Sequence, residues 1–257
     1  MTNVKSSFRT LDILEVFAIT QEPLSLQQIS DKLNIPQSSM SMLVKTLIDR
    51  GYLERDPRTR LLYPTLRVQM LGQWMSRRHK RAGKLPELLR ELTQKTGEMA
   101  SLAMRNDIYA QYILVHHASN PDRGNVESGM LFPLSCSAPG WCLLKHESPK
   151  AIEAIAWRTR SEVKNPHWKA TARFAAERVQ EANKVGYAMS NGETYPSACG
   201  ISILLPSVPG AMAMAATVGG RMERIQGKKP MILEALRDLS KSVLALQDDR
   251  PRELVAV

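Results

Sequence analysis

Cysteine and histidine side chains are the groups in this sequence whose chemistry could support nucleophilic catalysis. The cysteines are Cys136, Cys142 and Cys199, and the histidines of the same half are His116, His117, His146 and His167. A cysteine nucleophile needs a thiolate with a base beside it, and the spacing of these residues specifies no such pair. The sequence also lacks a Gly-rich phosphate loop, a nucleophile elbow and a pair of zinc ligands. A hydrolase is therefore an alternative with no defined site, and we expect no enzymatic activity, no metal and no cofactor.

The excess of basic residues points to a different chemistry, the binding of a polyanion. The formal net charge is +10 and the pI is about 9.7, which suits nucleic acid or an anionic membrane surface. The longest apolar stretch, residues 200–218, is cut by Pro206 and Pro209, so it predicts two buried strands rather than a spanning helix. The N-terminus shows no signal-peptide pattern. We therefore expect no membrane partner and a cytoplasmic, nucleoid-associated protein.

Short polar and basic side chains occur in the first sixty residues at positions suited to reading DNA. Glutamine, serine and lysine can hydrogen-bond base edges, methionine can touch a thymine methyl, and arginine can reach phosphates or the minor groove. The candidate DNA contacts are Ser25, Gln37, Ser38, Ser39, Ser41, Met42, Lys45, Arg58 and Arg60. We expect the two arginines to add affinity that does not depend on sequence.

Three helices and two strands are predicted to position these side chains. Apolar residues recur at helical spacing over 8–19, over 26–33 after a Ser25 cap, and over 37–50, where Gly51 ends the third helix. Residues 52–55 and 61–63 predict strands around a turn that carries Arg58 and Arg60. This order is typical of a winged helix-turn-helix, whose second helix enters the major groove. The alternative is a three-helix structural module with a polar surface, which the basic hairpin tip disfavours.

A connecting helix is predicted from Thr65 through Trp74, and the basic run 77–81 follows it before Gly83. We divide the chain into a DNA-binding domain at 1–65, a linker helix at 66–82 and a second domain at 83–257. The basic run is interpreted as a solvated face rather than a DNA contact. The apolar residues of the linker helix could form a dimer seam or pack on the first domain. They are Leu66, Val68, Met70, Leu71 and Trp74.

The second half of the sequence predicts an α+β domain. Helical periodicity runs over residues 85–95, 140–145, 150–157, 171–185 and 231–246. Strand patterns run over 99–104 and 109–115 around one turn, and over 200–205 and 211–218 around another. Strands and helices in this order favour a sheet covered by helices.

The segment from Arg9 to Tyr63, with RTLDILEVF and PLSLQQISDKLNIPQSSMSMLVKTLIDRGYLERD, closely resembles the isocitrate lyase regulator (IclR) family of bacterial transcriptional regulators. Shorter matches follow in the same order, among them LLRELTQKTG at 88–97, PLSCSAPGWCLL at 133–144 and GYAM at 186–189. The resemblance implies a GAF-like C-terminal effector domain with an antiparallel sheet flanked by helices. It also implies a homodimer or homotetramer that binds a palindromic operator in duplex DNA.

The resemblance further implies a small-molecule pocket between the sheet and the loop before the helix that starts near Gly140. The implied effector contacts are Leu134, Ser135, Ser137, Ala138, Gly140, Trp141, Ser190, Asn191, Cys199, Thr217 and Gly219. Ser135 stands where the family often has histidine, Trp141 where it often has lysine, and both Ser190 and Asn191 where acidic residues are frequent. A pocket of hydroxyls, a thiol and an indole has few charges to pair with a small carboxylate, so we expect an aromatic or weakly charged effector. Trp141 and Cys199 could equally fill the core.

Together these patterns predict a ligand-responsive, sequence-specific regulator of a metabolic or catabolic operon, either a repressor or an activator. Ligand binding would change the spacing of two DNA-binding domains in a two-state dimer. RNA polymerase is left open as a further partner. An architectural nucleic-acid protein is an alternative that the charge suggests, but it does not explain a second domain with its own core.

Overall fold

The structure is a computed structural model that describes residues 4–78, 80–119, 126–207 and 212–248, without the side chains of 74–82 and 247–248. Two compact units make up the chain, Met1–His79 and Lys80–Val257. Each unit packs around apolar residues of its own. The basic run 77–81 lies outside the described side chains, so the interpretation of its role stays a prediction.

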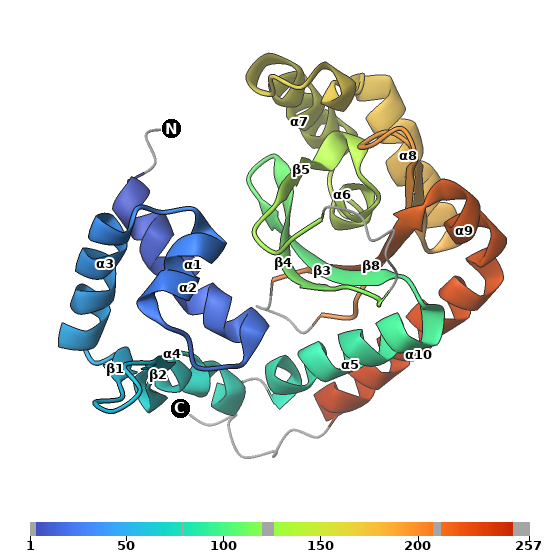
Figure 1. Ribbon diagram of the computed structural model, residues 1–257. Helices are drawn as coiled ribbons and strands as arrows, with labels where there is room; N and C mark the ends of the chain where they lie inside the picture. The colour runs from blue at the N-terminus through green and yellow to red at the C-terminus, as the bar shows by residue number, and fades with distance from the viewer. Residues whose placement is uncertain (1–3, 79, 120–125, 208–211, 249–257) are drawn as a thin grey trace, which may run out of the picture. The chain divides into compact units, whose positions relative to one another are not determined.

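The first unit consists of three packed helices followed by a two-stranded hairpin and a fourth helix (Figure 1). Its elements are α1 (Lys5–Thr20), α2 (Leu26–Leu33), α3 (Gln37–Asp49), β1 (Leu53–Arg55), β2 (Leu62–Pro64) and α4 (Leu66–Arg78). Ile13, Ile29 and Met40 are fully buried, so the three helices bury one apolar face each in a common core. The predicted helices and strands are confirmed, and Asn34 ends α2 in the left-handed conformation.

The second unit is built on one six-stranded antiparallel sheet (Figure 1). Its strands are β3 (Met99–Asn106), β4 (Tyr109–His116), β5 (Leu131–Pro133), β6 (Ala188–Asn191), β7 (Ala198–Leu204) and β8 (Met214–Arg221). Their order across the sheet is β5-β4-β3-β8-β7-β6. The first and last strands of the domain, β3 and β8, therefore pair at its centre.

Helices cover the two faces of this sheet in separate groups. On one face α5 (Lys80–Thr96) and α10 (Lys229–Asp248) pack against Ile201, Val218 and their neighbours. On the other face α6 (Ala138–Leu143) lies on β7 and β8, with α7 (Pro149–Glu162) and α8 (Ala172–Val185) outside it. Short helices η1 (Leu134–Cys136), η2 (Pro166–Trp168) and α9 (Met222–Gly227) complete the unit. The fold is the α+β arrangement expected, with a winged helix-turn-helix and a GAF-like domain.

Five short elements of the second unit, among them η1 and η2, were not indicated by the sequence patterns. Strands β5 and β6 hold only three and four residues, so pairing with β4 and β7 defines them more than residue alternation does. Helix α9 is equally short. A further difference is that α5 begins at Lys80 rather than at Leu85 and continues through Gly83 and Pro86, because both residues can adopt helical φ angles. Within the described residues, no helix is long and apolar enough to cross a membrane.

Candidate functional site

Helix α3 of the first unit presents a polar face to solvent. Its apolar residues Met40, Val44 and Leu47 are buried in the core, which fixes the rotation of the helix. Six predicted DNA contacts lie on its remaining surface: Gln37, Ser38, Ser41, Met42 and Lys45 are exposed, and Ser39 is half-buried. Met42 is 68% exposed, so its thioether is accessible to a thymine methyl. The structure therefore places the residues predicted to read bases together on one accessible helix surface.

Ser25 has a local structural role at the start of α2. Its hydroxyl accepts the N–H of Gln28 at 3.2 Å, and the side-chain oxygen of Gln28 accepts the N–H of Ser25 at 2.8 Å. This reciprocal pair is a capping box, which satisfies two backbone donors at the helix terminus. The hydroxyl hydrogen remains a donor that can reach a phosphate oxygen.

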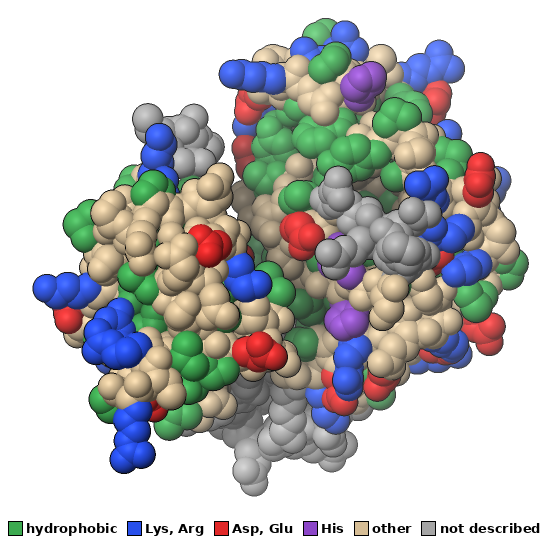
Figure 2. Space-filling view, in the orientation of Figure 1, with side chains coloured by type: hydrophobic (Ala, Val, Ile, Leu, Met, Phe, Trp, Pro, Cys, Tyr) green, Lys and Arg blue, Asp and Glu red, His purple; other side chains and the backbone are tan. Residues whose placement is uncertain are grey.

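The hairpin between β1 and β2 has a well-defined basic tip. The Asp56 carboxylate accepts the N–H groups of Thr59 and Arg58, both at 2.7 Å, and these bonds lower the pKa of Asp56 from its usual value. Arg60 adopts the left-handed conformation, with φ 61°. The side chains of Arg58 and Arg60 are exposed, and Figure 2 shows Lys and Arg side chains around this hairpin. A turn fixed by Asp56 thus presents two arginines to solvent.

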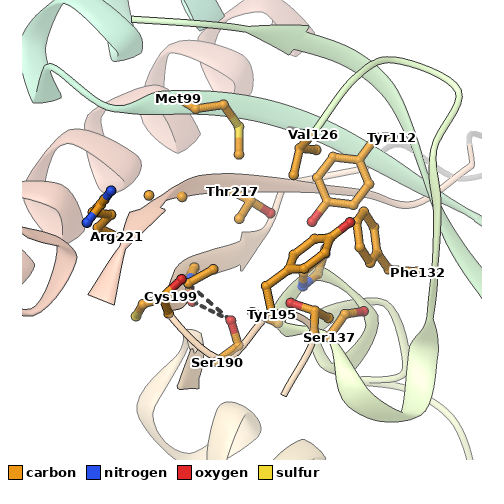
Figure 3. Close-up of a pocket in the computed structure, with 18 residues that line it drawn as sticks. Met99, Tyr112, Val126, Phe132, Ser137, Ser190, Tyr195, Cys199, Thr217 and Arg221 are labelled. Carbon is orange, nitrogen blue, oxygen red and sulfur yellow. Dashed lines mark hydrogen bonds between the residues drawn. The ribbon is translucent and has the colours of Figure 1, made fainter. Parts of the chain in front are cut away.

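The second unit contains a cavity of about 450 Å³ on the face of the sheet that α6 covers (Figure 3). Volumes of this size are typical of small-molecule sites. Strands β3, β4, β7 and β8 contribute to its floor, and the segments 132–139 and 194–197 contribute to its sides. Hydroxyl-bearing, aromatic and charged side chains are among those that line it, including Tyr112, Phe132, Ser137, Ser190, Tyr195, Thr217 and Arg221.

Buried hydroxyl groups form one wall of the cavity. The Ser137 hydroxyl donates to the Pro133 carbonyl at 2.8 Å, and the Ser190 hydroxyl accepts the N–H of Gly200 at 3.0 Å. The Thr217 hydroxyl lies 2.7 Å from that of Ser202. Each lining hydroxyl is therefore held by the protein while it retains capacity for one more hydrogen bond, which suits a polar but uncharged ligand group.

Aromatic rings lie at one end of the cavity, beside Ser137 (Figure 3). Phe132 lies between two tyrosines, with ring centroids 5.2 Å from Tyr112 and 5.9 Å from Tyr195. Burial raises the pKa of Tyr112 well above its usual value, so its phenol stays protonated. Among the described residues that line the cavity, Arg221 alone is charged, and it lies away from the aromatic rings.

The structure brings six of the predicted effector contacts to this cavity. They are Ser137, Ala138, Ser190, Cys199, Thr217 and Gly219. The other five do not line it: Leu134, Ser135, Gly140, Trp141 and Asn191. Leu134, Ser135 and Trp141 are completely buried, and the Trp141 indole N–H donates to the Ser135 carbonyl at 3.0 Å. Trp141 and Asn191 instead line a second, smaller cavity.

The aromatic lining of the larger cavity was missed in the sequence. Tyr112 belongs to a predicted strand, and its alternation with Ala110 on one face was the signal that could have found it. Phe132 lies in the three-residue strand β5 and Tyr195 in the turn before β7, and both segments are too short to show periodicity in the sequence.

The cysteines lack the environment that a nucleophile requires. Burial raises the pKa values of Cys136 and Cys142 to about 12 and that of Cys199 to about 11. Hardly any thiolate is therefore present at neutral pH. No group of acidic, cysteine and histidine side chains suited to a metal ion is found in the described part of the chain.

The chain joins a winged helix-turn-helix, whose helix α3 is accessible, to a domain with a cavity large enough for a small ligand. This combination defines a ligand-sensing DNA-binding protein. Comparison with known proteins identifies the family. Residues 7–57 match the IclR helix-turn-helix domain, and residues 79–245 match the bacterial transcriptional regulator IclR C-terminal domain. The chain belongs to the IclR family, and it is a DNA-binding transcriptional regulator with an effector-binding domain.

Individual relatives agree with this assignment. The regulator BhcR of Paracoccus denitrificans is 25% identical over 250 residues, which cover 95% of this chain and 89% of BhcR. TsaQ1/TsaQ2 of Comamonas testosteroni is 27% identical over 205 residues, covering 78% and 72% of the two chains. The crystal structure of an IclR homologue complexed with 4-hydroxybenzoate, from Microbacterium hydrocarbonoxydans, matches the fold with a TM-score of 0.63 at 18% identity. That match covers 95% of this chain and all of the homologue.

Proposed function

We propose that this protein is a ligand-responsive, sequence-specific regulator of a metabolic operon whose effector is an aromatic or weakly charged metabolite. The observation that supports the effector class is the composition of the larger cavity, which combines the rings of Tyr112, Phe132 and Tyr195 with buried hydroxyls. An aromatic ring gains favourable edge-to-face contacts with these rings, and its hydroxyl or carbonyl group gains hydrogen bonds with the hydroxyls. The 4-hydroxybenzoate complex of the Microbacterium homologue supports the same chemical class.

The effector class has a direct test in calorimetry. The purified protein is titrated with a panel that contains hydroxybenzoates, neutral phenols and small aliphatic acids of two to four carbons. We expect measurable heats of binding from aromatic compounds. Tyr112→Phe should weaken the binding of those compounds whose polar group hydrogen-bonds to the Tyr112 hydroxyl. Tight binding to the aliphatic acids alone would remove the proposal for this cavity.

In the DNA interface we assign base reading to α3 and phosphate binding to the hairpin. The exposed Gln37 at the helix start can form bidentate contacts with an adenine edge, whereas the exposed Arg58 at the wing tip suits phosphates. Gln37→Ala should weaken binding to the cognate operator by about 1–3 kcal/mol and leave nonspecific DNA unaffected. Arg58→Ala should weaken binding to both DNAs. It should also reduce the slope of log Kd against log salt concentration by about one, because one phosphate contact is lost.

Matched control variants make this division of roles measurable. Gln180→Ala and Arg173→Ala change an exposed glutamine and an exposed arginine of α8, in the other unit. Neither variant should alter binding to the operator. If Gln37→Ala and Arg58→Ala weaken every sequence to the same degree, the division between base reading and phosphate binding is refuted.

We further propose that the functional unit is a homodimer, or a homotetramer built from dimers, on a palindromic operator. The exposed apolar side chains of α4 support a seam between copies, because Leu66 is 76%, Met70 64% and Leu71 54% exposed. Ligand binding in the second unit would then act by favouring one spacing of the two reading helices over another. Leu66→Glu with Met70→Glu should shift the protein to monomers in sedimentation velocity, and an unchanged dimer would place the seam elsewhere.

A further inference from the structure

A second cavity lies in the C-terminal unit, apart from the one assigned to the effector. Its volume is about 160 Å³, and its walls come from α6, α8, β6 and the first residue of α10. Its lining includes Trp141, Arg178, Val185, Tyr187, Asn191 and Lys229. At roughly 30 Å³ for each water-sized occupant, it has room for about five or six non-hydrogen atoms.

The two cavities share none of their described lining residues, although both include residues of β6. Ser190 faces the larger cavity, whereas its neighbours Met189 and Asn191 face the smaller one. Ala188 also lines the smaller cavity, so the two spaces are distinguished by their lining residues and not by the alternation of the strand. A ligand in the smaller cavity would therefore occupy a distinct site.

Two cations stacked on aromatic rings give this cavity its chemical character. The guanidinium of Arg178 lies 5.9 Å from the ring centroid of Trp141 and 5.4 Å from that of Phe174. The ammonium of Lys229 lies 5.2 Å from the ring centroid of Tyr187. Such stacking fixes the position of a cation and leaves its N–H groups available to an anion. Arg178 also pairs with Glu181 at 2.7 Å, so one carboxylate already sits at the cavity edge.

The position of Lys229 in its helix also favours an anionic ligand. Lys229 begins α10, a helix of 20 residues with no acidic residue in its first turn. A cation is unfavourable at a helix N-terminus, where the backbone amides carry partial positive charge. The neighbouring Lys228 is neutralised by the buried Glu98, 2.9 Å away, whereas the described contact of Lys229 is the Tyr187 ring. An anion beside Lys229 would offset this accumulated positive charge.

We propose that the smaller cavity binds a small organic monocarboxylate of three or four carbons. Its carboxylate pairs with Arg178 and Lys229, and its short apolar chain packs against Val185, beside the Trp141 ring that Arg178 covers. Cavity volume limits the ligand to this size, and the rings lining the walls favour an organic anion over a fully hydrated inorganic one.

Two native tryptophans allow each cavity to be observed separately. Trp141 lines the smaller cavity, whereas Trp168 contacts Phe132 of the larger one and donates its indole N–H to Thr194 at 3.0 Å. The full-length protein is labelled with 5-fluorotryptophan, and its ¹⁹F resonances are assigned with Trp74→Phe, Trp157→Phe and Trp168→Phe, which leave Trp141 by elimination. Sodium butyrate is then titrated against sodium chloride at equal ionic strength.

We expect butyrate to shift the Trp141 resonance to saturation and to leave Trp168 in place. Arg178→Gln and Lys229→Gln should each raise the Kd by about tenfold or more, since each removes a charge-assisted hydrogen bond. Glu181→Gln should lower the Kd because it removes a competing carboxylate, and Arg173→Gln, an exposed arginine of the same helix paired with Glu177, should leave it unchanged.

The proposal is overturned by any of three results. They are no saturable shift of Trp141, a shift of Trp168 with the same concentration dependence, or an unchanged Kd in both Arg178→Gln and Lys229→Gln. The ¹⁹F spectra of the free variants show whether each is folded, because the buried Trp141 and the half-buried Trp168 report on native packing. If Arg178→Gln does not fold, Lys229→Gln and Glu181→Gln still test the proposal, because they should change the Kd in opposite directions.

Discussion

Thr217→Val removes one hydroxyl with little change in side-chain shape and tests both the stability and the ligand role of the cavity wall. The Thr217 hydroxyl lies 2.7 Å from that of Ser202, and the two residues are 2% and 0% exposed. The substitution leaves the Ser202 hydroxyl buried without this partner. An orphaned buried hydroxyl costs about 1–3 kcal/mol of unfolding free energy. For a domain of this size the melting temperature should fall by about 2–10 °C.

A second substitution separates the two roles. Adding Ser202→Ala removes the orphaned hydroxyl, and replacing both partners by apolar groups is nearly neutral, so most of the lost stability should return. Ser202 does not line the cavity, whereas Thr217 does. Affinity for an aromatic effector should therefore stay about fivefold weaker in the double variant as in Thr217→Val, because one hydrogen bond to the ligand is missing in both.

Urea unfolding followed by circular dichroism measures the stability, and calorimetry with the tightest aromatic ligand measures the affinity. The reasoning is refuted if the double variant is as unstable as Thr217→Val, since the cost would then not come from the orphaned hydroxyl. Recovery of ligand affinity together with stability would show that Thr217 acts through the fold and not through contact with the ligand.

Three further predictions follow from the local geometry. Ser25→Ala removes the capping box of α2 and should lower the unfolding free energy of the first unit by about 1 kcal/mol, measured by urea unfolding, with an unchanged midpoint arguing against the cap. Gly140→Ala places a Cβ 2.4 Å from the Leu134 carbonyl oxygen, so it should destabilise the second unit by about 2 kcal/mol or more, and a wild-type melting temperature would contradict this packing. The pKa of Cys199 is raised to about 11, so its reaction with iodoacetamide at pH 8 should be far slower in the native protein than in denaturant. The reaction rate should still increase up to pH 9 and beyond, and a plateau near pH 8 would disprove the raised pKa.

Elements with strong periodicity were predictable from the sequence. The Ser25 cap, the left-handed Asn34 and the apolar faces of α1 to α3 are local signals, so the helix-turn-helix was indicated before its packing was known. Strands β3, β4, β7 and β8 were indicated by apolar runs around turns. The family resemblance then supplied the arrangement of the second domain, including the region of the effector pocket.

Side-chain directions in the second domain depended on packing that the sequence does not encode locally. Trp141 was expected at the effector, but the rotation of α6 turns its indole toward the Ser135 carbonyl and α8, which places it on the smaller cavity. Asn191 directly follows Ser190 in a short edge strand, yet the two residues line different cavities. Phe132 and Tyr195 reach the larger cavity from short segments that tertiary pairing alone positions.

Fluorescence anisotropy with the intergenic DNA upstream of the protein's own gene tests the central claim most directly. The purified protein is titrated against this DNA and a scrambled duplex of equal length, at near-physiological salt, with and without the aromatic panel. The account predicts site-selective binding whose affinity one aromatic compound changes, and loss of that response in Thr217→Val with Tyr112→Phe. Equal, salt-sensitive binding to both duplexes, unaffected by every compound, would contradict a ligand-responsive regulator.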